Sequence, residues 1–127
     1  MAATFKELRV WQTAMDSAMV IFEKSKSFPS EEKYSLTDQI RRASRSVAAC
    51  ISEAWRRRRY VAAFVSKLNE AETEAAEVQT WIEIALRCKY WPDELARELD
   101  DQMEKICSQL TLMIRDAQKW CTPGRKR

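Results

Sequence analysis

The stretch Leu36–Arg59, LTDQIRRASRSVAACISEAWRRRR, decides how this chain folds. Its apolar side chains recur in steps of three and four, the spacing that places residues on one face of an α-helix. This apolar face comprises Leu36, Ile40, Ala43, Val47, Cys50 and Ala54. The stretch therefore predicts a helix that buries one side in a core.

The opposite side of the same predicted helix carries positive charge. Between Gln39 and Arg59 there are seven arginines and one acid, Glu53, for a local net charge of +6. The arginines are Arg41, Arg42, Arg45, Arg56, Arg57, Arg58 and Arg59. Four of them would lie within roughly 60° of one another around the axis of a continuous helix. These four are Arg41, Arg45, Arg56 and Arg59.

Composition indicates an all-α protein of one domain. The chain has 127 residues but only one glycine and three prolines, whereas an all-β or α/β chain of this size needs many more turn residues. No uninterrupted apolar run approaches the roughly 18 residues of a membrane span, so we expect no membrane association. The net charge is only +3, but it is segregated along the chain, which favours electrostatic contacts with a polyanion or between subunits.

Apolar periodicity and the few prolines predict four helices, at about 6–26, 36–57, 60–89 and 92–120. Phe28-Pro29 should end the first helix, and Ser35 with Asp38 resembles a capping box that opens the second. A break is expected between Arg57 and Tyr60, because one helix from 36 to 90 could not bury its own apolar face. Short connections then give an antiparallel, up-down-up-down bundle over residues 1–121, followed by a disordered basic tail at 122–127.

The predicted core positions form one row on each helix. On the first helix they are Leu8, Trp11, Met15, Ala18 and Phe22. On the third they are Val61, Phe64, Leu68, Ala71, Ala75, Val78, Ile82 and Ala85. On the fourth they are Leu95, Leu99, Met103, Ile106, Leu110, Met113, Ala117 and Trp120. Large apolar residues outside or at the ends of these rows, such as Trp55, Trp81 and Trp91, predict a second buried surface and hence a homo-oligomer.

The residue types exclude most catalytic chemistry. The chain has no histidine, its four cysteines are far apart in sequence, and no glycine-rich phosphate loop is present. We therefore expect no metal site, no cofactor and no enzymatic activity. Because no signal peptide is recognisable, we expect reduced thiols in a cytoplasmic protein.

Several motifs resemble a known family. They are F-x-E-L-x-V-W-Q at Phe5–Gln12, F-P at Phe28-Pro29, Tyr34-Ser35-Leu36, and Gln39-Ile40-Arg41-Arg42-Ala43. In these motifs, the chain resembles the four-helix-bundle proteins encoded in bacterial 23S ribosomal RNA intervening sequences. The resemblance implies a cytosolic bundle without enzymatic activity that assembles into a ring, with a pentamer as the expected size. It also implies kinship with accessory bundles of diversity-generating retroelements, which bind nucleic acid and a protein partner, reverse transcriptase.

Two functions remain open for the seven arginines. In the first, they bind the phosphates of RNA or DNA, since guanidinium groups match phosphate oxygens. In the second, the protein is a structural or protein-interaction bundle, and its arginines make salt bridges between subunits. Trp55 and Tyr60, which flank the run Arg56–Arg59, fit base stacking, but packing at an interface is the favoured interpretation.

Overall fold

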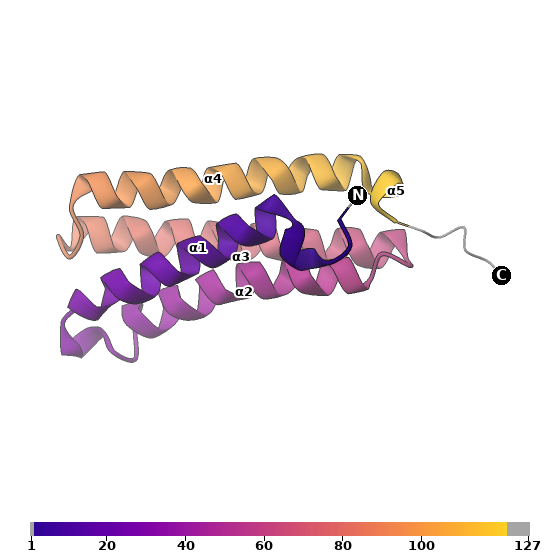
Figure 1. Ribbon diagram of the computed structural model, residues 1–127. Coiled ribbons are helices and arrows are strands. Elements are labelled where there is room, and N and C mark those ends of the chain that lie inside the picture. Colours follow the sequence, from indigo (N-terminus) through magenta and orange to yellow (C-terminus); the bar gives the residue numbers. More distant parts are fainter. Residues whose placement is uncertain (1, 122–127) are drawn as a thin grey trace.

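The computed structural model describes residues 2–121, and they form a four-helix bundle (Figure 1). The long helices are α1 (Arg9–Lys24), α2 (Leu36–Arg56), α3 (Val61–Arg87) and α4 (Asp93–Arg115). Each packs antiparallel against the next, and α1 packs against α4 to close the bundle. The predicted all-α, up-down-up-down architecture is confirmed, and residues 2–121 contain no β-strand. The expected tail at 122–127 lies outside the described residues.

The first and last predicted helices are each interrupted. Phe5–Glu7 form a separate 3-10 turn, η1, capped by Thr4, and Leu8 is extended before α1 begins. A second 3-10 turn, η2 (Ser25–Ser27), ends this segment, because the hydroxyls of Ser25 and Ser27 donate to carbonyls three residues earlier. The helix predicted at about 6–26 is therefore confirmed, but its α-helical part is shorter at both ends, from Arg9 to Lys24.

The predicted fourth helix also breaks, at Asp116. The Asp116 carboxylate accepts two hydrogen bonds from the neighbouring Arg115 guanidinium, and its backbone leaves helical geometry (φ −99°, ψ 26°). A short helix, α5 (Ala117–Trp120), follows. Helix α4 thus ends at Arg115 and not at Trp120.

The expected capping box at Ser35 does not form. Ser35 makes no side-chain bond to the helix, and its backbone has φ −125° and ψ −105°. Instead, the Glu32 carboxylate, from the 3-10 turn η3 (Ser30–Glu32), accepts a hydrogen bond of 3.1 Å from the Leu36 amide. The acid that caps α2 therefore precedes the helix instead of lying in its first turn.

The core confirms the predicted rows on α2, α3 and α4 but not on α1. The α1 residues that are fully buried are Val10, Ala14, Ser17, Ala18 and Ile21. Of the five predicted, Leu8 and Ala18 are buried, whereas Met15 is 37% exposed. Trp55 and Trp91, which we expected at a subunit interface, are 6% and 3% exposed within one chain. Their burial is explained by the bundle itself.

An aromatic contact joins the two connections at one end of the bundle. The Phe28 ring lies 5.4 Å from that of Tyr90 and 5.1 Å from that of Trp91. The Tyr90 hydroxyl donates to Glu32 (2.8 Å), and the Trp91 indole donates to the Lys24 carbonyl (3.0 Å). The α1–α2 connection is thereby fixed against the α3–α4 connection.

Candidate nucleic-acid interface

The structure divides the seven arginines into two groups. Helix α2 ends at Arg56, so Arg57, Arg58 and Arg59 lie in the turn before α3, and the continuous basic face that would include Arg59 is not formed. Arg45 and Arg56 are about 16 Å apart along the helix axis at 1.5 Å per residue. We call Arg41, Arg42 and Arg45 the groove cluster and Arg56–Arg59 the end cluster.

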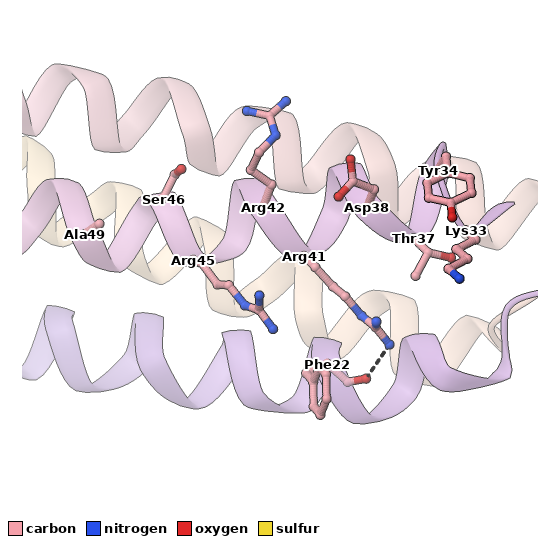
Figure 2. A pocket seen from close by; sticks show the side chains of 10 residues that line it. All are labelled: Phe22, Lys33, Tyr34, Thr37, Asp38, Arg41, Arg42, Arg45, Ser46 and Ala49. Atoms are coloured by element: carbon pink, nitrogen blue, oxygen red, sulfur yellow. Dashed lines mark hydrogen bonds between the residues drawn. The ribbon is translucent and has the colours of Figure 1, made fainter.

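The groove cluster lines an open groove of about 740 Å³ along the exposed side of α2 (Figure 2). This volume falls within the roughly 300–1,000 Å³ typical of ligand sites. The groove is lined by Phe22, Lys33, Tyr34, Thr37, Asp38, Arg41, Arg42, Arg45, Ser46 and Ala49. Three elements contribute to it: α1, the connection after η3, and α2.

Arg41 is the anchored member of the groove cluster. Its Nε donates to Ser25 Oγ at 2.8 Å, and a terminal nitrogen donates to the Phe22 carbonyl at 3.3 Å. Its guanidinium carbon also lies 4.7 Å from the centre of the Phe22 ring, within cation–π range. Arg41 therefore ties α2 to the end of α1, and its role is partly structural.

Arg42 and Arg45 are exposed and less constrained. Arg42 donates to its helix neighbour Gln39 at 2.8 Å, and the Arg45 guanidinium lies 5.7 Å from the Phe22 ring centre. Figure 2 shows Arg45 extending from α2 toward Phe22 and Arg42 extending from α2 away from it. Their guanidinium groups keep donors available for an anion.

The charge of the groove is strongly positive. Lys33 and the three arginines face one acid in the lining, Asp38. None of the seven arginines makes a salt bridge within residues 2–121. Paired arginines on a helix commonly make structural salt bridges, and Arg41 and Arg42 do not make them within this chain.

Glu74 on α3 is the acid that interacts with Arg42 across the helix interface. Burial, together with the nearby Glu77 carboxylate, raises the pKa of Glu74, and the attraction of Arg42 only partly offsets this. One Glu74 carboxylate oxygen is buried and has no hydrogen-bond partner among the described residues. The Arg42 guanidinium is therefore attracted to the Glu74 carboxylate on α3, but the two groups do not form an ion pair.

The end cluster is arranged differently. Arg58 stacks on Trp55, with its guanidinium carbon 3.5 Å from the ring centre, and its Nε donates to the Trp55 carbonyl at 2.9 Å. Arg56 is exposed at the end of α2, where its guanidinium carbon lies 5.9 Å from the centre of the Phe5 ring. Arg57 and Arg59 are exposed in the turn that follows, and the neighbouring Tyr60 is 63% exposed. None of these three arginines lines the groove.

The acid and the thiols near the arginines have other partners or none. Glu53, the one acid between Gln39 and Arg59, pairs with Lys67 at 2.9 Å. All four cysteines are free thiols, and burial, followed by the Glu70 charge, raises the pKa of Cys50 to about 11.

Over residues 2–121, no three His, Cys, Asp or Glu side chains cluster closely enough to hold a metal ion. In the same part of the chain, no helix has both the length and the apolar character required to cross a bilayer.

Sequence reasoning missed Lys33, Tyr34 and Phe22 as parts of the site. Tyr34 and Asp38 are four residues apart, and Arg41, Arg42 and Arg45 follow at the next helical steps. This spacing weakly indicates that the five side chains lie near one another along a helix. That signal was weak because Lys33 and Tyr34 precede α2, in a connection whose path the sequence does not specify locally.

The fold defines the class of the protein: it is a four-helix bundle. Within that class the chain belongs to the 23S rRNA-intervening sequence protein family, whose model matches residues 6–112. The family resemblance seen in the sequence motifs is thus confirmed.

A solved relative supports the same assignment. It is a protein of unknown function from the S23 ribosomal protein family of Bacteroides thetaiotaomicron, known from a crystal structure. The two chains are 29% identical with a TM-score of 0.75, and the match covers 84% of this chain and 95% of that chain. No protein with a curated description matches this chain.

Proposed function

We propose that this protein binds nucleic acid, and RNA in particular, through the groove cluster, with the end cluster adding long-range attraction. The observation that carries the proposal is a groove lined by four cations and one acid, in which none of the arginines is neutralised by a salt bridge within the described chain. Uncompensated arginines beside one another repel, so an anionic ligand stabilises the arrangement.

The chemistry of arginine matches this ligand. A guanidinium presents donors in a planar fork that can bind two phosphate oxygens at once, and these contacts position a nucleic acid without reading its sequence. Arg42 and Arg45 supply such forks from adjacent turns of a regular helix, whereas Arg41 holds that helix in place. RNA is favoured over DNA because the family description names a ribosomal RNA intervening sequence.

The proposed action is binding without catalysis in a cytosolic protein. The sequence has no histidine for acid–base chemistry, and the buried Cys50 thiol has a pKa of about 11, far from that of a reactive thiolate. Four free thiols accord with a reducing compartment.

A salt series tests the proposal. Binding of a fluorescently labelled single-stranded RNA is measured by anisotropy from 50 to 300 mM salt, roughly the range in which phosphate contacts dominate. We expect log affinity to fall linearly with log salt, with a slope of about −0.7 for each phosphate bound. A control with Arg87, Arg97 and Lys105 changed to Gln removes three exposed cations outside both clusters and should keep most of the affinity. Absence of binding by the wild type at the lowest salt would refute the proposed function.

A second candidate function is favoured for the end cluster alone. Figure 1 shows the α2–α3 turn and the start of α4 at opposite ends of the bundle, so Arg56–Arg59 cannot pair with the acids Asp93, Glu94 and Glu98 of the same chain. Contact between these surfaces needs a second copy, and such a head-to-tail contact closes into a ring when its rotation allows. Exposed Met19 (57%) and Leu112 (49%) offer apolar area for the same assembly.

Light scattering tests this second candidate. If end-cluster contacts hold a ring, such as the pentamer that the family resemblance implies, the wild type should have several times the 14.9 kDa mass of one chain. Changing Arg56, Arg57 and Arg59 to Gln should then yield smaller species. An unchanged mass would leave these arginines free for nucleic acid.

A further inference from the structure

Tyr34 is the most exposed large apolar side chain among residues 2–121, at 83%. It lies at one end of the groove, next to Thr37 and Asp38, and Figure 2 shows its ring beside the groove and not folded into the core. Leaving an aromatic ring in water forgoes the free energy that its burial would provide, about 1.5–3 kcal/mol for a large apolar side chain. Nothing in the packing of the bundle requires a tyrosine here.

The position of Tyr34 is nonetheless fixed by the segment that carries it. Glu32 holds this segment twice: one carboxylate oxygen accepts from the Leu36 amide, and the other accepts from the Tyr90 hydroxyl. The Ser35 amide also donates to the Glu32 carbonyl at 3.0 Å. The backbone on both sides of Tyr34 is therefore anchored to α2 and to the α3–α4 connection, and the ring is presented from a rigid base.

One face of the ring already has a cationic neighbour. Lys33 Nζ lies 5.3 Å from the Tyr34 ring centre, and because the side chain is 83% exposed, the other face is open to a ligand. An open aromatic face beside a row of guanidinium groups is the arrangement by which proteins hold single strands, with bases stacked on rings and phosphates held by cations.

We infer that the groove binds a single-stranded segment of nucleic acid, with one base stacked on Tyr34 and phosphates further along the strand held by Arg42 and Arg45. This inference rests on the proposed function and specifies the strand form that the site selects. From Thr37 to Ala49 the groove follows α2 for about 18 Å at 1.5 Å per residue, enough for a few nucleotides.

A duplex would not use Tyr34 in this way. Its bases are stacked on one another, so an aromatic side chain outside the duplex has no base face to contact. A duplex can still bind the arginines, since its phosphates are exposed. The aromatic ring therefore distinguishes single strands from duplexes, whereas the arginines attract both.

The test compares Tyr34→Ala with a matched control, Tyr60→Ala, which removes an exposed tyrosine beside the end cluster. Affinity is measured for a 12-nucleotide single strand and a 12-base-pair duplex, each as RNA and as DNA. We expect Tyr34→Ala to weaken single-strand binding at least about fivefold and to leave duplex binding unchanged, because stacking adds free energy only for an unpaired base. Tyr60→Ala should change neither. Tyr34→Trp should retain single-strand affinity.

Two results would overturn the inference while leaving the proposed function intact. One is wild-type binding with a steep salt slope that Tyr34→Ala does not alter. The other is an equal loss for the single strand and the duplex. The salt slope of Tyr34→Ala should match that of the wild type, since the ring neutralises no phosphate. Photocrosslinking of a 5-iodouridine strand gives an independent readout: the adduct should map to Tyr34, and an adduct confined to Tyr60 or Trp55 would contradict the stacking position.

Discussion

The two arginine clusters have similar composition but different surroundings. The groove cluster lies on a regular helix between α1 and the anchored connection at residues 30–35, so its guanidinium groups surround a concave space. The end cluster lies where α2 stops: Arg56 ends the helix, and Arg57 and Arg59 are exposed in the turn that follows. A concave surface can hold several groups of one ligand at once, whereas exposed charges outside the groove mainly contribute long-range attraction.

Each cluster also contains one arginine that the fold uses. Arg41 bonds to Ser25 and the Phe22 carbonyl, and Arg58 stacks on Trp55 and bonds to its carbonyl. The other members make no comparable tertiary hydrogen bond within residues 2–121. A count of arginines therefore overstates the number of groups available for binding, because anchored guanidinium groups have fewer free donors.

Removing equal charge from each cluster should show which one binds. Lys33, Arg42 and Arg45 changed to Gln should weaken RNA binding about 100-fold at 0.1 M salt and flatten the salt slope by about 2, the sum of three lost phosphate contacts. Arg56, Arg57 and Arg59 changed to Gln should cost less than about tenfold, because charges outside the groove supply mainly long-range attraction. Anisotropy titrations over the same salt series measure both. A larger loss from the end-cluster variant would reverse the comparison and remove the groove as the main site.

A second pair of variants distinguishes the arginine of the groove cluster that stabilises the fold from one that is free to bind RNA. Arg41→Gln should destabilise the bundle by about 1–2 kcal/mol, because it removes hydrogen bonds to Ser25 and the Phe22 carbonyl. The control Arg45→Gln should leave the free energy of unfolding nearly unchanged, since the described structure gives Arg45 no hydrogen bond to another residue. Urea unfolding followed by circular dichroism measures both. Equal stability of the two variants would show that the Arg41 contacts contribute nothing net.

The fold was predictable on helices where the most hydrophobic row of residues is also the row that packs into the core. On α3, the apolar row from Phe64 to Ala85 is unambiguous, and those residues are buried. On α1, two rows compete, and the buried one contains Ala14 and Ser17. Such small residues give a weak hydrophobic signal but allow close approach of helices, whereas the larger Met15 lies at the edge of the interface. A pattern that follows hydrophobicity therefore selected the wrong row.

The site was predictable only in part, for a related reason. The arginines were visible because they are consecutive or at helical spacing. The groove was not, because its second wall depends on the Tyr90–Glu32 hydrogen bond between residues 58 positions apart in sequence. Contacts of such separation fix where Lys33 and Tyr34 lie, and no local pattern encodes them.

The smallest expected effect concerns the acid in the groove. Asp38→Asn removes the negative charge that lies among Lys33, Arg42 and Arg45, while nearly preserving the size of the side chain. If phosphates occupy the groove, RNA affinity should rise, by up to about fivefold for one repulsive charge near a surface, and the gain should shrink at high salt. The matched control is Asp101→Asn, an exposed acid on α4 away from both clusters, which should change affinity less. Anisotropy at 50 and 300 mM salt, roughly either side of physiological screening, measures both variants. A fall in affinity for Asp38→Asn would mean that the carboxylate accepts a hydrogen bond from the bound strand, and the groove would then hold a base, not a phosphate, beside Asp38.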